Sequence, residues 1–190
     1  MLKVKEDVST SFLIVSEPRA TFTSGVSALP SDLLWNEQIL KEKGIALCPV
    51  TRGGKWTYHG PGQVVIFPIF RLEQFGLNNR DTKGFVELLT QAVQSFLETE
   101  GLTSSVKETP YGIYVNDKKI CSFGVRVERG ITSHGLALSL YKQSEPFKGI
   151  NPCGHENAKL TSLWEEERTI TWVDAAHQLV ESIKKSFKLP

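Results

Sequence analysis

The chain has 190 residues, 40% of them hydrophobic and 23% charged, and a formal net charge of +1 from 22 basic and 21 acidic residues. This length and composition predict one globular domain, 1–190, with a sizeable core. The balanced charge argues against a broad basic face for nucleic acid, and no apolar run is long enough to cross a membrane. Three cysteines and no signal-peptide core predict a cytoplasmic protein with reduced thiols.

Short apolar runs bounded by turn residues predict strands in the first part of the chain. They lie at 12–15, 45–50 and 64–70. Thr23-Ser24-Gly25 is expected to form a turn, and Ser31 is a candidate N-cap for a helix that stops at Gly44. The next helix is the clearest, because its apolar residues recur at helical spacing between a cap at Asp81 and a stop at Gly101.

Beyond this helix the apolar period changes to two. The pattern predicts strands at 103–107, 112–115, 118–127 and 134–141. Asn116-Asp117 and Glu128-Arg129-Gly130 are the expected turns between the last three. A polar, irregular segment over 142–159 precedes a final helix capped by Thr171. The inner face of that helix is expected to hold Val173, Ala176, Leu179, Val180, Ile183 and Phe187. This order predicts an α+β fold, with helices flanking a mixed, mainly antiparallel sheet.

One polar stretch is unlike a core segment. The run from Arg52 to Gln63 holds four glycines and leads directly into the strand at 64–70. Glycine lets a ligand approach backbone N–H groups closely, and charged and aromatic side chains stand between these glycines, so the run favours a binding site. It lacks the spacing of a phosphate-binding loop, and it contains no Gly-Lys-Ser/Thr.

Two residues suit covalent chemistry. Cys153 lies between a proline and a glycine in the irregular segment, as an exposed nucleophile would. Strict alternation places Lys119 on one strand face with Cys121, Phe123 and Val125. Partial desolvation on that face would lower the pKa of the lysine and make it a usable base. Cys121 shares the face and is therefore a rival nucleophile.

Other assignments of the cysteines and histidines stay open from the residues alone. Cys48 lies in an apolar strand and is expected in the core. His59, His134, Cys153 and His155 can be drawn together as a zinc site, but no C-x-x-C or helical spacing supports it, so no metal is expected. A Cys–His hydrolase, with His59 or His134 as the base, can also be drawn.

Three blocks of the sequence together resemble the signature of lipoyl(octanoyl) transferases. The first is Arg52-Gly53-Gly54-x-x-Thr57-Tyr58-His59-Gly60-Pro61-Gly62-Gln63. The second runs from Lys118-Lys119-Ile120 through Gly124-Val125-Arg126 to His134-Gly135-x-Ala137-Leu138. The third is Asn151-Pro152-Cys153-Gly154, followed by Leu160-Thr161-Ser162-Leu163. The fold that this resemblance implies is that of the biotin/lipoate protein ligase catalytic domain.

The resemblance implies an enzyme that moves an octanoyl group from acyl carrier protein to a lysine on a lipoyl-carrier domain. Such acceptors are the lipoyl domains of 2-oxoacid dehydrogenases and the glycine cleavage H protein. The resemblance implies Cys153 as the nucleophile and Lys119 as the residue that lowers the pKa of its thiol. The substrate-binding residues that it implies are Arg52, Gly53, Gly54, Lys55, Trp56, Thr57, Tyr58, His59, Ser122, Phe123, Gly124, Gly135, Leu136 and Ala137.

The resemblance implies no cofactor and no metal. Trp56 stands where the family usually has a small aliphatic residue, and it could narrow the acyl tunnel. Two alternatives remain, an ATP-dependent lipoate or biotin ligase of the same fold and a non-catalytic protein that binds lipoyl domains. A cysteine placed like Cys153 argues against the ligase, and dependence on ATP would decide between them.

Overall fold

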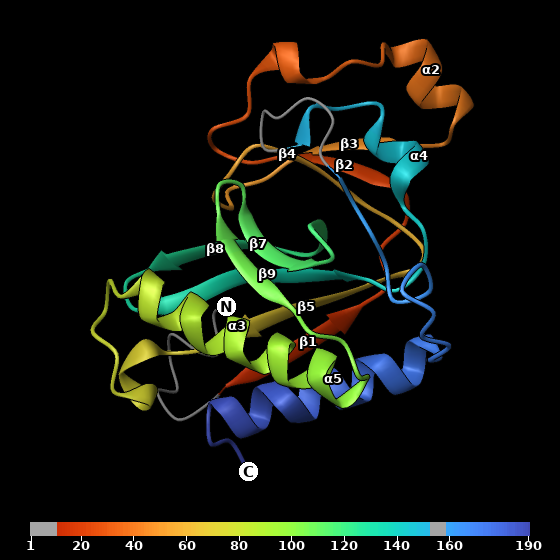
Figure 1. Cartoon of the computed structure of the whole chain (residues 1–190). Coiled ribbons are helices and arrows are strands. Elements are labelled where there is room, and N and C mark those ends of the chain that lie inside the picture. Colours follow the sequence, from red (N-terminus) through yellow and green to blue (C-terminus); the bar gives the residue numbers. More distant parts are fainter. Residues whose placement is uncertain (1–10, 153–158) are drawn as a thin grey trace.

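The computed structural model of the protein describes residues 11–152 and 159–190, which form two sheets surrounded by helices (Figure 1). The larger sheet has the strand order β1 (Phe12–Ser16), β5 (Gln63–Ile69), β9 (Ile131–Ser139), β8 (Lys118–Glu128), β7 (Tyr111–Val115) and β6 (Ser105–Glu108). Each strand in it is antiparallel to its neighbours. The smaller sheet has the order β3 (Ala46–Pro49), β2 (Thr21–Ser24) and β4 (Trp56–His59), with β2 parallel to β3 and antiparallel to β4. The predicted α+β fold with a mainly antiparallel sheet is confirmed.

Two long helices, α3 (Thr82–Thr99) and α5 (Trp172–Ser186), lie side by side on one face of the larger sheet (Figure 1). The shorter helices α2 (Glu37–Glu42) and α4 (Ser144–Phe147) lie beside the smaller sheet, and 3₁₀ turns occupy Pro30–Asp32 and Leu72–Phe75. Within the described ranges, no helix is both long enough and apolar enough to span a membrane.

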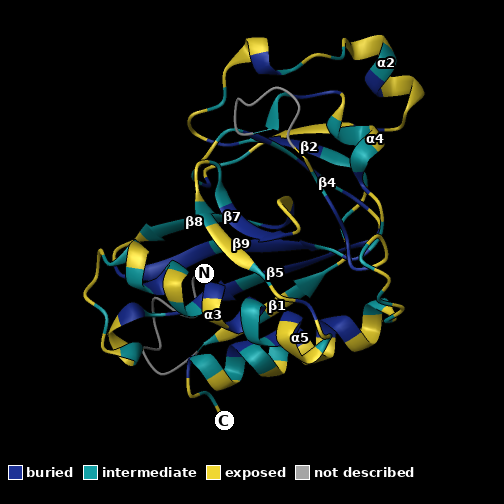
Figure 2. Ribbon diagram, in the orientation of Figure 1, coloured by how far each residue is buried: buried dark blue, intermediate teal, exposed yellow. Residues whose placement is uncertain are grey.

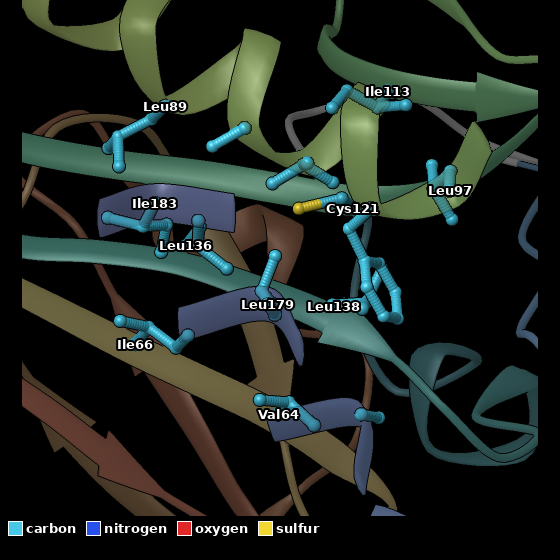
Figure 3. Close-up of a cluster of buried hydrophobic side chains, with 14 of the residues drawn as sticks. Val64, Ile66, Leu89, Leu97, Ile113, Cys121, Leu136, Leu138, Leu179 and Ile183 are labelled. Carbon is cyan, nitrogen blue, oxygen red and sulfur yellow. The ribbon is translucent and has the colours of Figure 1, made fainter. Parts of the chain in front are cut away.

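The main core fills the space between the two long helices and the larger sheet. Alternate residues of β5 and β9, such as Val64 and Ile66 or Leu136 and Leu138, point into this core (Figure 3), and both strands are largely buried (Figure 2). Ile66 and Leu138, for example, are fully buried with Leu89 of α3 and with Leu179 and Ile183 of α5. The helices therefore occupy one face of the sheet and leave the other face for the smaller sheet.

Several predicted element ends are confirmed by their local geometry. The Asp81 carboxylate accepts a hydrogen bond from an N–H in the first turn of α3 at 2.8 Å, and Thr171 Oγ1 does the same for α5 at 3.1 Å. Gly101 follows α3 with a φ of 73°. Asn116 and Asp117, with φ of 48° and 62°, join β7 to β8. Two left-handed residues in succession match the twist of a tight hairpin.

The segment after β1 differs from the prediction. Thr23 and Ser24 belong to β2 instead of forming a turn, because they pair with both β3 and β4. Ser31 lies in a single 3₁₀ turn, and the extended Leu33 that follows bridges to Ile150. The helix therefore begins later, where Asn36 Oδ1 accepts a hydrogen bond from a first-turn N–H of α2 at 3.0 Å.

Three other predictions fail for reasons of tertiary position. Cys48 is exposed, because β3 is an edge strand and all four of its residues are exposed. Val173 is 69% exposed, because α5 turns Ala175, Ala176, Leu179 and Ile183 toward the core. The segment over 142–159 is not wholly irregular, since α4 lies within it.

Candidate active site

A cavity of about 1180 Å³ lies where the glycine loop and β4 face the larger sheet. Its wall combines residues of β5, β8 and β9 with the loop, with α3 and with the hairpin of β6 and β7. Period two turns neighbouring residues of a strand to opposite faces. One set of side chains on the larger sheet therefore fills the core, and the other set is available to line this cavity.

Most of the residues that the resemblance implies meet on this wall, although they come from three separate segments. Those that line the cavity are Arg52, Gly53, Gly54, Lys55, Trp56, Thr57, His59, Lys119, Ser122, Phe123, Gly124, Gly135, Leu136 and Ala137. Tyr58 does not line it, because its ring packs in a second core against Phe22 and Phe147, with ring centroids 5.9 Å apart in each pair. Cys153 lies outside the described residues.

Trp56 borders the cavity, but the structure holds its indole in the second core. The side chain is buried there with Phe22 and Tyr58, and its Nε1 donates a hydrogen bond to the Leu29 carbonyl at 2.8 Å. That Trp56 narrows the acyl tunnel stays a prediction, because the side chain borders the cavity as well as packing in the second core. Alternation along β4 turns Trp56 and Tyr58 to the second core, while Thr57 and His59 stay on the side of the cavity.

Arg52 organises the glycine loop from within. Its buried guanidinium donates to the Thr23 carbonyl and hydroxyl, both at 2.8 Å, and to the main-chain oxygens of Lys55 at 2.8 Å and Gly53 at 2.9 Å. The guanidinium is planar and permanently charged, so its N–H groups can donate to several fixed acceptors at once. Its stem lies against Gly124, where an added Cβ would stand 2.8 Å from Arg52 Cδ. The arginine therefore ties the loop to β2 and to β8.

The two histidines beside the cavity are held in their neutral form. The pKa of His59 is lowered to about 4, chiefly by burial and also by the charge of Arg52, against a contact with Gln63 that raises it. Burial also lowers the pKa of His134, with smaller contributions from Arg52 and Arg126. His134 has a φ of 59° inside β9, and strained backbone of this kind clusters at functional sites.

Among the described residues, no metal cluster accounts for these histidines. Within residues 11–152 and 159–190, no three histidine, cysteine or acidic side chains are placed to hold an ion. Two members of the zinc site drawn from the sequence, Cys153 and His155, lie outside those ranges.

Lys119 is buried at the end of the cavity nearest β7. It is 7% exposed, and its Nζ donates to the Tyr111 carbonyl at 2.7 Å. Gly112 makes room for it, because a Cβ there would collide with Lys119 Cε. Tyr111 is fixed in turn, since its ring lies 5.7 Å from that of Phe123 and its hydroxyl lies 2.9 Å from Thr90 Oγ1. The ammonium or amine of Lys119 is thus held in one place.

Both ends of the segment that contains Cys153 are anchored beside the cavity. On one side, Asn151 N–H donates to the Asp32 carbonyl at 2.8 Å. On the other, Lys119 N–H donates to the Lys159 carbonyl at 2.8 Å, and Thr161 N–H donates back to the Lys119 carbonyl at 3.0 Å. After Cys153, the chain is therefore hydrogen-bonded at Lys159 and Thr161 to the main chain of Lys119.

Cys121 is a core residue and is wrong as a rival nucleophile. It is 1% exposed, lies among the core side chains in Figure 3, and has a thiol whose pKa burial raises to about 12. The predicted shared face fails because the pairing register shifts: Tyr114 pairs with Lys119, while Ile113 pairs with Cys121. One extra residue in β8 sends Lys119 to the cavity and Cys121 to the core.

Several lining residues were not foreseen from the sequence. Val65 and Phe67 line the cavity from β5, and Tyr111 and Thr90 line it from β7 and α3. Period two could have indicated the first two, because they alternate with core residues of the same strand. No local signal marks Tyr111 or Thr90, which meet only through the tertiary fold.

The chain is similar to one family of known catalytic domains and to several named relatives. The family model described as the lipoyl protein ligase A/B catalytic domain matches residues 1–184. An octanoyltransferase of Coxiella burnetii is 34% identical over 183 residues, which cover 96% of this chain and 72% of that protein. An octanoyltransferase of Caldanaerobacter subterraneus subsp. tengcongensis is 36% identical over 188 residues, with coverages of 98% and 81%.

Solved structures agree with these relatives at the level of the fold. A bi-partite lipoate protein ligase from Thermoplasma acidophilum superposes with a TM-score of 0.80 at 13% identity, over 96% of this chain and 73% of the other. The biotin protein ligase of Aquifex aeolicus gives a TM-score of 0.54 at 13% identity, with coverages of 87% and 68%. The fold expected from the resemblance is confirmed.

Proposed function

The chain belongs to the family of lipoyl protein ligase A/B catalytic domains, and on that premise we propose octanoyl transfer from acyl carrier protein to a lipoyl-domain lysine through a Cys153 thioester. The observation that carries the proposal is the cavity, which joins an apolar sheet face to the fixed Nζ of Lys119. The chain leaving Cys153 is hydrogen-bonded to the strand of Lys119. We propose that the thioester on that cysteine forms beside Lys119, which acts as the proton acceptor.

The reaction has two balanced steps. In the first, Lys119 takes the thiol proton, the Cys153 sulfur attacks the octanoyl thioester carbonyl, and the donor leaves as a thiol that takes the proton back. In the second, the acceptor amine attacks the enzyme thioester, an amide forms, and the thiolate of Cys153 leaves. Lys119 collects the proton that the amine loses. Exchange between thioesters is nearly balanced and amide formation is downhill, so neither step requires ATP.

The family points to lipoyl-domain proteins as the acceptors of the octanoyl group. We infer that they are the lipoyl domains of 2-oxoacid dehydrogenases and the glycine cleavage H protein, each of which presents one lysine. His59 and His134 are neutral, so neither places a positive charge in the way of an approaching lysine ammonium.

Intact-mass measurement without ATP tests the proposal. Octanoyl-acyl carrier protein should add one octanoyl group to the wild type, hydroxylamine should remove it, and Cys153→Ala should abolish it. The matched controls are Cys48→Ala and Cys121→Ala, which should both keep the adduct because one thiol lies on an edge strand and the other in the core. An adduct on Cys153→Ala would refute the assignment. An adduct that needs free octanoate and ATP would indicate a ligase.

A further inference from the structure

Two parts of the cavity wall differ in chemistry, and we name them the sheet limb and the helix limb. The sheet limb is lined by the cavity face of the larger sheet: Val65, Phe67, Ser122, Gly135 and Ala137. The helix limb is lined by the mainly polar side chains of α3 and by the β6–β7 hairpin: Lys83, Val86, Glu87, Thr90, Gln91, Gln94, Val106, Glu108 and Tyr111. An eight-carbon chain gains from burial against apolar atoms and not against amides and carboxylates. The sheet limb is therefore where an acyl chain is most stable.

Three residues of the sheet limb lie in line across the strands. Ser122 of β8 pairs with Ala137 of β9, and Ala137 pairs with Val65 of β5. Strands are about 4.8 Å apart, so the row from Ser122 to Val65 spans roughly 10 Å. An extended octanoyl chain has seven C–C bonds of about 1.5 Å, which project to roughly 9 Å along the chain. A chain that starts over β8 would end at Val65.

Val65 has the properties of a cavity wall and not of a core residue. It is 4% exposed, yet among the described residues it belongs to none of the three hydrophobic clusters, unlike its neighbours Val64 and Ile66. Its pairing partner on β1 is Ser16, which does not line the cavity. The limb therefore ends at β5, with Val65 as its last side chain along the row.

We propose that Val65 sets the length of acyl chain that the enzyme accepts, an inference that rests on the proposed function. The chain crosses the sheet over Ser122 and Ala137, and its terminal methyl group meets Val65. A smaller side chain at this position extends the limb, and a larger one shortens it. Neither change touches Lys119, which lies at the other end of the cavity.

Acyl-chain competition among variants tests this assignment. Hexanoyl-, octanoyl-, decanoyl- and dodecanoyl-acyl carrier protein would be offered to the wild type, Val65→Ala and Val65→Phe, and acyl-enzyme formation followed by intact mass. Burying one more methylene is worth about fourfold, so Val65→Ala should raise the ratio of decanoyl to octanoyl rates by about 15-fold. Val65→Phe should lose octanoyl transfer and keep hexanoyl transfer, which an unfolded variant could not do.

Val106 provides the matched control, because it is also a valine on the cavity wall but lies in the helix limb. Val106→Ala and Val106→Phe should leave the chain-length ratios unchanged. If the Val65 variants transfer octanoyl with wild-type ratios, or if the Val106 variants shift the ratios instead, the inference is wrong and the proposed function stands. A wild type that transfers no acyl chain would overturn both, and that result would be seen before any variant is compared.

Discussion

Replacing Gly112 with alanine should slow acyl-enzyme formation about a hundredfold in a chain that still folds. An added Cβ would overlap Lys119 Cε, and it would stand 3.0 Å from Lys119 Nζ and 2.7 Å from the Cys121 carbonyl oxygen. Carbon contacts are comfortable at about 3.5–4.0 Å, so the lysine side chain must move by roughly 1 Å. A displacement of that size in a positioned group can lower a rate about a hundredfold.

The effect on stability should be modest, which separates it from the effect on rate. The Cys121 carbonyl belongs to the main chain of β8 and cannot turn aside, so overpacking should cost about 1–3 kcal/mol of unfolding free energy. Single-turnover acylation followed by intact mass gives the rate, and denaturant unfolding gives the stability.

Gly44→Ala is the control for this measurement. Gly44 has a φ of 65°, and an added Cβ would meet nothing within 4 Å. The left-handed conformation should still cost about 1–2 kcal/mol, so the control is destabilised without contact with Lys119. The reasoning fails if Gly112→Ala acylates at the wild-type rate, or if Gly44→Ala slows acylation as much.

Three further predictions concern single residues. Arg52→Lys should lower the unfolding free energy by about 2–3 kcal/mol in denaturant, because lysine cannot bridge the same acceptors. The pKa of His59 is held at about 4 against an ordinary 6.5. The neutral His59 imidazole therefore contributes its full share of the unfolding free energy above pH 6.5. That share is lost as the pH falls toward 4, and the loss is about 2 kcal/mol at pH 5. His59→Gln should remove that part of the pH slope measured by urea unfolding at pH 7 and pH 5. Asp81→Ala should cost about 1 kcal/mol by thermal unfolding and leave acylation unchanged, since it removes only a helix cap.

Sequence reasoning succeeds here where the signal is local. The caps of α3 and α5 and the turn at Asn116-Asp117 each depend on a few consecutive residues, and each is confirmed. The glycine loop and the segments 122–124 and 135–137 lie together on one wall of the cavity. The family resemblance of the three motif blocks predicts this arrangement, and no single pattern does. Together these signals are enough to locate the cavity.

The incorrect predictions concern residues whose burial depends on segments far away in the sequence. Alternation alone places Lys119 and Cys121 on one face, and an extra residue in β8 reverses that arrangement without any glycine or proline to mark it. Cys48 looks like a core residue, because the sequence does not reveal that β3 lies at the edge of its sheet. Val65 also looks like a core residue, because it lies in a continuous apolar run, although its face of β5 meets the cavity.

The glycines around the cavity and Val65 have different roles in the site. Gly124 is bare because the stem of Arg52 lies on it, and Gly112 is bare because Lys119 lies on it. Gly135 permits β9 to approach β5, where a Cβ would collide with the Ile66 carbonyl. Gly112 and Gly124 thus make room for side chains of the site, and Gly135 makes room for the neighbouring strand. We therefore expect a substitution at Gly112, Gly124 or Gly135 to impair transfer of every chain length alike, whereas a substitution at Val65 should change only which chain is preferred.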